Sequence, residues 1–346
     1  MTEASNLQIV ARQTVAIVGA TGAVGAELIG CLERRDYPVG ELRLLASPRS
    51  AGRTLPFRGR EVVVEVLAPE RFHGVDVALF AAGKSVSREY APIAMAAGAT
   101  VIDNSSAFRL DPDRPLVVPE VNGRLLDARP QLIANPNCVA VIAVMALAPI
   151  HARNPVRRVI GSTYQAASGA GAAAMEELRE ATAAALAGEA FTPKVLPHPY
   201  GFNVFSHNTD VDPGTGYNDE EAKVMAETRK MLDAPDLRIS FTCVRVPVPR
   251  AHTLSLNIEC ERPLDLGEVE AWLTAAPGVR IVNDWQANRF PMPIEASGVD
   301  EVLAGRIRHD ASDPSGRSIH LMLAGDQLLK GAALNAVQIA EALRAA

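Results

Sequence analysis

A glycine-rich segment near the N-terminus, AIVGATGAVG, restricts the possible folds more than any other part of the chain. It places Gly19, Gly22 and Gly25 directly after a strand predicted over residues 14–18 and at the start of a helix predicted over residues 23–34. Glycines at such a turn let the backbone approach a pyrophosphate, which then lies at the positive end of the helix. The spacing is GxxGxxG rather than GxGxxG, and alone it also fits an ordinary strand-to-helix turn. The strand and helix context favours nucleotide binding.

Short apolar runs separated by helical stretches follow this segment. We predict strands at residues 42–46, 64–67, 75–80, 100–103 and 132–134. Near-continuous apolar strands of this kind are typical of a parallel sheet covered on both faces. The fold class is therefore α/β, with a doubly wound, Rossmann-type nucleotide-binding domain over residues 1–137. Residues 1–12 are predicted to be a loose tail of that domain.

The pattern changes in the second half of the chain. Residues 238–246 (RISFTCVRV) and 253–259 (TLSLNIE) alternate apolar and polar side chains. Such alternation suits a sheet with one covered face and one wetter face. With helices predicted near 139–150, 172–186 and 220–232, residues 138–328 are predicted to form an α+β substrate and dimerisation domain with a mixed sheet. The Ala-rich segment 329–346 is predicted to be a helix that packs back on the first domain.

Composition and charge exclude several classes of protein. The 346 residues are 48% hydrophobic and 21% charged, as in a globular protein, and the net charge of −6 argues against nucleic acid or an anionic membrane as partner. The longest apolar run is too short to span a bilayer, and the N-terminus has no leader pattern, so we expect a cytoplasmic protein. No metal site is expected, because the four widely spaced cysteines form no CxxC pair.

The segment after the second predicted strand bears on the choice of cofactor. Enzymes that prefer NAD place an acid about 20 residues after the glycines, on the ribose 2′-hydroxyl. Here the segment reads LLASPRSAGR and offers Ser47, Arg49, Ser50 and Arg53, with no acid. Hydroxyls and a guanidinium suit a 2′-phosphate, so the segment predicts NADP. A solvated polar loop is the alternative interpretation.

Cys138 stands out among the cysteines. It lies in ANPNCVAVIAV, after a predicted strand and at the start of an apolar helix. A helix N-terminus stabilises negative charge and so lowers the pKa of a thiol, and the thiolate is the reactive form. We therefore predict that Cys138 is a nucleophile with a lowered pKa. Cys31, Cys243 and Cys260 are predicted to be small buried hydrophobic residues, as most free cysteines are.

Nine strings in the chain resemble aspartate-semialdehyde dehydrogenases, in the order seen in that family. They extend from residue 19 to residue 341 and read GATGAVG, ASPRSAGR, DNSSAFR, NPNC, STYQAASGAG, GYNDEEAK, RVPVPRAH, AGRIRHD and KGAALNAVQIAE. The resemblance implies an NADP-dependent enzyme of lysine, threonine and methionine biosynthesis. It implies that β-aspartyl phosphate is converted through a cysteine thioester to aspartate semialdehyde and inorganic phosphate.

The resemblance also implies roles for individual residues. In catalysis it implies Cys138 as the acylated nucleophile, Gln165 as the residue that orients the acyl group and His252 as the acid/base. For the substrate it implies Arg109 at the phosphate, Glu220 and Lys223 as the pair that binds the amino group and the phosphate, and Arg245 at the α-carboxylate. For the cofactor, the predicted contacts lie in the glycine-rich turn and in the segment after the second strand: Gly19, Thr21, Gly22, Ala23, Val24, Gly25, Ser47, Arg49 and Ser50. The resemblance adds Asn335 near the nicotinamide.

Side-chain chemistry supports part of this assignment independently. A substrate with a carboxylate, an ammonium and an acyl phosphate needs two cationic sites and one anionic site. Arg245 continues an otherwise apolar strand face, although an interface salt bridge is an alternative for it. Glu220 and Lys223 are three residues apart on a helix, so a plain surface ion pair is the alternative there. Without the resemblance, nothing in the sequence would distinguish His252, Gln165 and Asn335 from ordinary polar residues.

The chain departs from the family pattern at four positions. Val139 and Ala140 stand where hydroxyl residues usually follow the nucleophile, and Lys84 and Leu329 replace a small residue and an arginine. Two rival functions therefore stay open: an enzyme like N-acetyl-γ-glutamyl-phosphate reductase, whose substrate has no ammonium for Glu220, and a non-catalytic nucleotide-binding paralogue. The one-sided second sheet and the resemblance indicate a homo-oligomer, either a dimer or a dimer of dimers.

Overall fold

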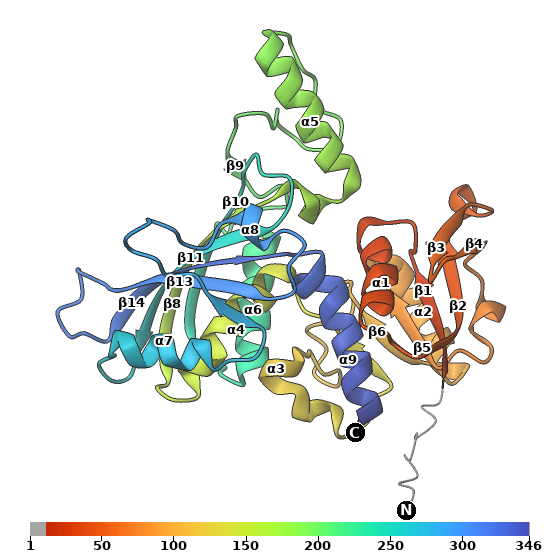
Figure 1. Cartoon of the computed structure of the whole chain (residues 1–346), viewed down its shortest axis with the longest axis horizontal. Coiled ribbons are helices and arrows are strands. Elements are labelled where there is room, and N and C mark those ends of the chain that lie inside the picture. The colour runs from red at the N-terminus through yellow and green to blue at the C-terminus, as the bar shows by residue number, and fades with distance from the viewer. Residues whose placement is uncertain (1–11, 346) are drawn as a thin grey trace, which may run out of the picture.

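The structure, a computed structural model, describes residues 12–345. These residues form two seven-stranded sheets, with a helix near the C-terminus lying between them (Figure 1). The tail predicted for residues 1–12 lies outside the described residues except for its last residue. Within the described part, no helix is both long and apolar enough to cross a membrane.

The first sheet has the strand order β3-β4-β2-β1-β5-β6-β7. Its strands are β1 (Gln13–Val18), β2 (Val39–Ala46), β3 (Thr54–Phe57), β4 (Arg60–Val66), β5 (Val77–Phe80), β6 (Thr100–Asp103) and β7 (Leu132–Ala134). All neighbours pair in parallel except β3, which is antiparallel to β4. The doubly wound domain is thus confirmed, and the β3–β4 hairpin is an addition that the apolar pattern did not predict.

The helices of the first half are α1 (Ala23–Arg34), α2 (Lys84–Ala96) and the short α3 (Pro119–Asn122). Helix α1 has the bounds predicted from the sequence. Its side chains Leu28 and Leu32 are fully buried in one core with Ile17 of β1. Burial of this apolar stripe fixes the glycine-rich turn between β1 and α1 in place.

The second sheet has the order β12-β13-β14-β11-β8-β10-β9. Its strands are β8 (Val156–Gln165), β9 (Phe205–Ser206), β10 (Arg238–Arg245), β11 (His252–Cys260), β12 (Val279–Ile281), β13 (Val302–His309) and β14 (Ser318–Gly325). Strands β8 and β10 pair in parallel, as do β12 and β13, and the other pairs are antiparallel. The predicted mixed sheet is confirmed.

Three helices share one hydrophobic core with this sheet: α4 (Cys138–His151), α6 (Asp219–Leu232) and α7 (Leu266–Thr274). Helix α4 is almost wholly buried, as its apolar sequence predicts. Helix α8 (Pro293–Ala296) is a single short turn. The apolar side chains of Ile160 and Tyr164 on β8 remain 46% and 42% exposed, so the sheet has an uncovered face.

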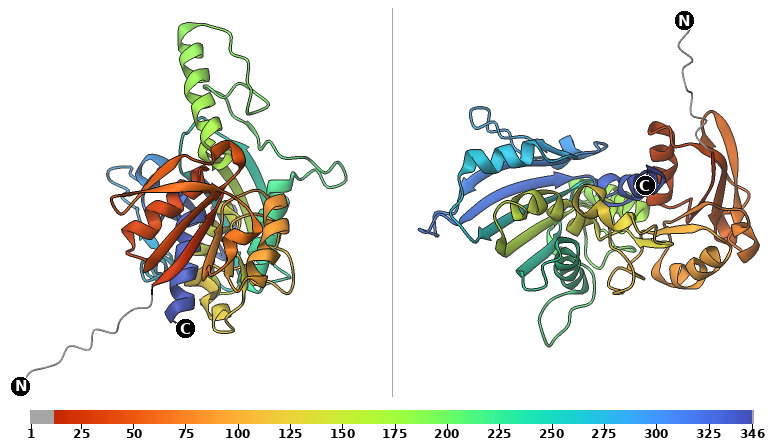
Figure 2. Two further views of the ribbon diagram at one scale, coloured as in Figure 1. Left: turned by 90° about the vertical axis from the view of Figure 1, so that its right-hand side faces the viewer. Right: turned by 90° about the horizontal axis from the view of Figure 1, so that it is seen from below.

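Two further helices, α5 and α9, do not belong to the core of the second sheet. Helix α5 (Ala172–Ala187) projects from the body of the molecule, as Figure 1 and the left view of Figure 2 show. Helix α9 (Leu334–Ala345) packs on the core of the first sheet and contacts α1. The predicted C-terminal helix therefore begins later than expected, because residues Leu329–Ala333 form a wider π-helical turn.

Candidate active site

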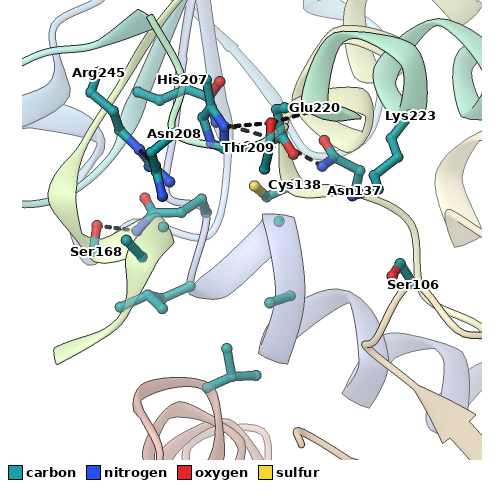
Figure 3. A pocket seen from close by; sticks show the side chains of 18 of the residues that line it. Ser106, Asn137, Cys138, Ser168, His207, Asn208, Thr209, Glu220, Lys223 and Arg245 are labelled. Atoms are coloured by element: carbon teal, nitrogen blue, oxygen red, sulfur yellow. Dashed lines mark hydrogen bonds between the residues drawn. The ribbon is translucent and has the colours of Figure 1, made fainter. Parts of the chain in front are cut away.

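A pocket of about 530 Å³ lies at the meeting of the two halves. Val24 of α1, Asn104 and Ser106 after β6, and Leu328 and Gly331 before α9 line it together with residues of the second domain. Seven of the residues predicted from the sequence line this pocket: Val24, Arg109, Cys138, Gln165, Glu220, Lys223 and Arg245. Figure 3 shows Cys138, Glu220, Lys223 and Arg245 gathered around it.

Cys138 is the first residue of α4, and Asn137 is the helix cap. The Asn137 Oδ1 accepts hydrogen bonds from the backbone N–H groups of Val139 at 2.9 Å and Ala140 at 3.1 Å. Asparagine is a preferred residue at this position because its side chain satisfies N–H groups that the helix leaves free. The side chains of Val139 and Ala140 are fully buried in the core. Their departure from the family pattern therefore falls in the core and not on the pocket wall.

The π-helical turn closes over the nucleophile from the other side. A Cβ atom added to Gly331 would lie 2.8 Å from the Cys138 Cβ and 3.2 Å from its Cα. Such distances are shorter than van der Waals contact, so only glycine fits here without a shift of the backbone. The turn thus sets the position of the Cys138 side chain.

The pKa of Cys138 corrects our prediction for it. Burial and the negative charge of Glu220 raise this pKa to about 12, and Arg109, Arg245 and the Val139 N–H offset them only in part. The helix N-terminus, which lowers a thiol pKa, can be recognised in the sequence, but burial and the carboxylate of Glu220 cannot. Burial and Glu220 have the larger effect on the pKa of Cys138. This arrangement therefore favours the neutral thiol of Cys138 over the thiolate. The other three cysteines are free and buried, as predicted.

The charge of Glu220 gives a test of this pKa. We expect Glu220→Gln to speed alkylation of Cys138 by iodoacetamide at pH 8 by about tenfold, because one cause of the raised pKa is removed and more thiolate forms. The rate is measured by mass spectrometry of the peptide that contains Cys138. Asp219→Asn is the matched control, since Asp219 is the exposed neighbour on α6. Equal rates in Glu220→Gln and wild type would contradict the assignment.

Arg245 and Gln165 meet because their strands are parallel and in register. Gln165 at the end of β8 lies opposite Arg245 at the end of β10. Arg245 is only 3% exposed, and its guanidinium donates to Asn208 Oδ1 at 3.0 Å and to the Ala166 carbonyl at 3.1 Å. No carboxylate among residues 12–345 forms a salt bridge with Arg245. A buried guanidinium without an anionic partner is a site for an anion from outside the chain.

Glu220 supplies the matching negative charge. Its Oε1 accepts hydrogen bonds from Asn137 Nδ2 at 3.0 Å and Gln165 Nε2 at 3.1 Å. Burial opposes its ionisation, but His207 and these two donors lower the pKa of Glu220, so it carries a charge at neutral pH. It is 8% exposed and forms no ion pair with Lys223, which instead pairs with Asp219 at 3.7 Å. The surface ion pair considered for Glu220 and Lys223 is therefore absent from this part of the chain.

Arg109 lies at the other end of the pocket, together with Lys223. Its guanidinium donates to the carbonyls of Asn135 at 2.9 Å and Asn104 at 2.7 Å, and it pairs with Glu227 at 3.3 Å. Both cations also line an adjoining hollow of about 480 Å³, to which Lys84 and Arg88 contribute from α2. Lys84, unusual at its position, therefore adds positive charge beside this end of the site.

His252 begins β11 and lies directly behind the pocket wall. Its Nδ1 accepts the backbone N–H of Ala166 at 3.0 Å, while its buried Nε2 has no hydrogen-bond partner among the described residues. Burial, and secondarily the charge of Arg245, lower the pKa of His252 well below its usual value. The ring is thus neutral, with Nδ1 as acceptor and the proton on Nε2. A Cβ added to Gly169 would lie about 3.0 Å from both this ring and Arg245.

The glycine-rich turn has the geometry that a dinucleotide requires. Gly19 has a φ of +86°, and a Cβ added to Gly25 would lie 2.4 Å from the Gly19 carbonyl oxygen. No side chain caps the start of α1, so its N–H groups remain available to a phosphate. Thr21 Oγ1 lies 3.3 Å from Ser50 Oγ, which joins this turn to the segment after β2. The remaining predicted cofactor positions occupy the same two segments: Gly22, Ala23, Ser47 and Arg49.

Asn335 is not brought to the pocket, which corrects its implied contact with nicotinamide. It is fully buried, and its Nδ2 donates to the Val117 carbonyl at 2.9 Å and to Asn135 Oδ1 at 2.6 Å. Its Oδ1 accepts a hydrogen bond from Lys330 Nζ at 2.9 Å. Because the amide is fully used in the interior, Asn335 supports the segment that leads to Cys138.

Glu227 and Asn104 are among the site residues that the sequence analysis did not identify. Glu227 is fully buried, accepts the Asn137 backbone N–H at 2.6 Å and pairs with Arg109. It lies seven residues after Glu220 on α6. This spacing places both carboxylates on one helix face, so the sequence could have indicated that Glu227 lies near the site. Asn104 lines the pocket with a buried Oδ1 that has no partner in the described part of the chain. It lies in the string DNSSAFR, where nothing but the resemblance marks it.

Family models match both halves of the chain. The model for the semialdehyde dehydrogenase NAD binding domain matches residues 14–128. The model for the semialdehyde dehydrogenase dimerisation domain matches residues 147–330. Together with the glycine-rich turn and the cysteine in the pocket, these matches define a semialdehyde dehydrogenase that uses a nicotinamide cofactor.

Individual relatives narrow this class to one family. An aspartate-semialdehyde dehydrogenase of Synechocystis is 49% identical over 95% of this chain and 96% of its own length, and one of Bacillus subtilis is 44% identical over 95% and 97%. The crystal structure of aspartate semialdehyde dehydrogenase II of Vibrio cholerae, complexed with ASA, is 40% identical with a TM-score of 0.92, over 96% of this chain and 98% of that one. The chain belongs to the aspartate-semialdehyde dehydrogenase family.

Proposed function

We propose that this chain catalyses the reductive dephosphorylation of β-aspartyl phosphate to aspartate semialdehyde and the reverse reaction, through a thioester on Cys138. The proposal rests on the set of side chains that line one pocket. Cys138 lies there with Arg245, a buried cation without an anionic partner among residues 12–345, and Glu220, a buried anion. The related Vibrio cholerae enzyme was crystallised with ASA.

Substrate groups pair with the pocket charges by sign. Arg245 binds the α-carboxylate and Glu220 binds the ammonium group, because each buried charge gains an opposite partner. Arg109 and Lys223 bind the phosphate at the other end of the pocket, where Lys84 and Arg88 add positive charge. An N-acetylated substrate would leave Glu220 buried without a cation, so an N-acetyl-γ-glutamyl-phosphate reductase is not favoured.

In the acylation step Cys138 Sγ attacks the acyl carbon of the substrate. The S–C bond forms and the C–O bond to phosphate breaks. Because Cys138 is a neutral thiol, its proton leaves as the S–C bond forms, and the departing phosphate accepts it. Gln165, held by Glu220 and by Thr163 at 3.0 Å, orients the acyl group.

In the second step the thioester is reduced. A bound nicotinamide cofactor supplies the hydride. The Nε2–H of neutral His252 donates a hydrogen bond to the oxygen that becomes negative and so stabilises the tetrahedral thiohemiacetal anion. On collapse, the negative oxygen re-forms the carbonyl, the C–S bond breaks with its electron pair going to Sγ, and aspartate semialdehyde leaves. Cys138 Sγ then takes up one proton from solvent, which restores the thiol.

The test is an assay in the reverse direction with two aldehydes. Aspartate semialdehyde with inorganic phosphate and NADP should give NADPH, and N-acetylglutamate semialdehyde should not. Omission of phosphate should abolish steady turnover, because only phosphate releases the acyl group from Cys138. Turnover with the N-acetylated aldehyde alone would replace the proposal by the rival reductase, and turnover with neither would favour a non-catalytic paralogue.

We further propose that NADP is the preferred cofactor. Ser47 and Arg49 are exposed beside the nucleotide turn, and Arg49 forms no salt bridge within the described residues. We expect Arg49→Glu to raise the KM for NADP by about tenfold and to leave the KM for NAD unchanged, because a charged hydrogen bond to the 2′-phosphate is lost. Arg60→Glu, an exposed change on β4, is the control. Equal effects on both cofactors would refute the preference.

The proposed organisation follows from the same elements. We propose an NADP-binding domain with the boundaries 1–137, completed by the segment 329–346, and a catalytic and dimerisation domain with the boundaries 138–328. The uncovered face of the second sheet, with Ile160 and Tyr164, is the proposed contact in a homodimer or a dimer of dimers. Four free cysteines favour a reducing compartment, the cytoplasm.

A further inference from the structure

The projecting helix α5 and the loop that follows it form a small core of their own. Ala174 and Leu178 of α5 pack with Leu196 and Tyr200 of the loop and with Ala167. This core is separate from those of the two sheets. The turn at residues 167–170, which carries Ser168 and Gly169 on the pocket wall, therefore rests on α5 and its loop.

The loop itself reaches the pocket. Val195 and Leu196 line it, as do Ser168 and Gly169 of the turn described above. Leu196 is 4% exposed, since its side chain is buried in the small core. These two residues have no regular secondary structure to fix their backbone. Their position must come from contacts with the helix.

Glu177 of α5 provides these contacts. Its carboxylate accepts three backbone hydrogen bonds: Oε2 from Lys194 at 2.5 Å and Val195 at 2.7 Å, and Oε1 from Leu196 at 2.8 Å. Glu177 is 4% exposed and forms no salt bridge with a described residue. An ionised carboxylate buried in this way is stabilised by the N–H groups it holds, so helix and loop are fixed to each other.

Two more contacts join the loop to its surroundings. The Tyr200 hydroxyl donates to the backbone carbonyl of Gln165 at 3.3 Å. A Cβ added to Gly201 would lie 2.8 Å from the backbone of Ala181, so loop and helix backbones touch there. The loop held by Glu177 is thus in contact with the strand end that presents Gln165.

We propose that Glu177 is a positioning residue for substrate binding, which holds residues 194–196 as a wall of the pocket. The proposal rests on the function proposed above, because the pocket is the one that binds the semialdehyde. Glu177 touches no reacting atom. Its effect is on how closely the wall fits the substrate, so it acts on KM more than on kcat.

The test compares Glu177→Gln with Glu176→Gln. Glutamine keeps the size of Glu177 but turns an NH₂ group toward backbone donors, so at least one hydrogen bond is lost. We expect the KM for aspartate semialdehyde to rise about tenfold, with kcat and the KM for NADP nearly unchanged. Trypsin should cleave faster after Lys194, which is exposed. Glu176, paired with Arg179 on the exposed side of α5, should show neither effect.

A second variant reaches the loop without touching Glu177. Gly201→Ala adds a methyl group against the Ala181 backbone and should push the loop from α5, with the same rise in KM and in cleavage after Lys194. Far-UV circular dichroism shows whether each variant is folded. A folded Glu177→Gln enzyme with the KM of wild type overturns this inference while the proposed function stands. An inactive wild type overturns the proposed function itself.

Discussion

Serine in place of Cys138 is expected to lower kcat for phosphate-dependent NADP reduction by at least about 10³-fold. A hydroxyl is a far weaker acid and a poorer leaving group than a thiol. The surroundings of Cys138 already disfavour an anion, since burial and Glu220 raise the pKa of the thiol to about 12. An alkoxide at the same place is still less accessible, so neither formation nor collapse of the acyl enzyme proceeds.

The measurement separates chemistry from binding. Steady-state rates give kcat, and titration of NADPH fluorescence gives the affinity for cofactor, which Cys138→Ser should leave unchanged. Cys243→Ser is the matched control, because Cys243 is buried on β10 and is not among the pocket residues. A Cys138→Ser enzyme that keeps a tenth of the wild-type rate would remove Cys138 from the role of nucleophile.

Alanine in place of Gly331 is expected to reduce kcat by about 10²-fold, because small displacements of a reacting atom have effects of this size. The added methyl carbon would lie 2.8 Å from the Cys138 Cβ and 3.3 Å from the Gln327 Cβ. Both neighbours are held by the backbone, so Cys138 or the π-helical turn has to move. Such overpacking also costs about 1–3 kcal/mol of the free energy of unfolding.

Gly123→Ala is the control for this second experiment. Gly123 has a helical φ of −53°, and a Cβ added there meets nothing within 4 Å. It should keep full activity and stability. Thermal unfolding and kinetics are measured on both variants at the same pH. An active Gly331→Ala enzyme would show that the turn is free to move away from Cys138, against the tight contact that the structure describes.

Apolar periodicity predicted every strand of the first sheet except β3 and most of the long helices, but it missed several strands of the second sheet. Strand β8 contains Gly161, and β13 contains Gly305, both unfavourable in a strand by local preference. In the folded chain the Phe241 ring occupies the space beside Gly161, and the Val282 carbonyl lies against Gly305. These glycines allow other segments of the chain to approach the strands closely. A local apolar pattern cannot predict such contacts.

The candidate site was predicted mainly through the family resemblance, with chemistry supporting the charged positions. The direction of the pKa shift of Cys138 was predicted wrongly, because it depends on burial and on a carboxylate from another helix. Asn335 was expected to contact the nicotinamide, but its side chain forms its hydrogen bonds with Val117 and Asn135 in the interior. Glu227 and Glu177 both accept hydrogen bonds from backbone N–H groups of other segments. The spacing of Glu227 from Glu220 indicates a shared helix face, but no spacing within the sequence identifies these N–H partners.

The π-helical turn around Gly331 belongs to both halves of the molecule at once. Its residues Leu329 and Ala333 are buried in the core of the first sheet, while Gly331 lies against Cys138 at the start of α4. A rotation of one half against the other would therefore pull this turn away from Cys138 or press it inward. The nucleophile keeps its place only while the two halves hold one relative orientation.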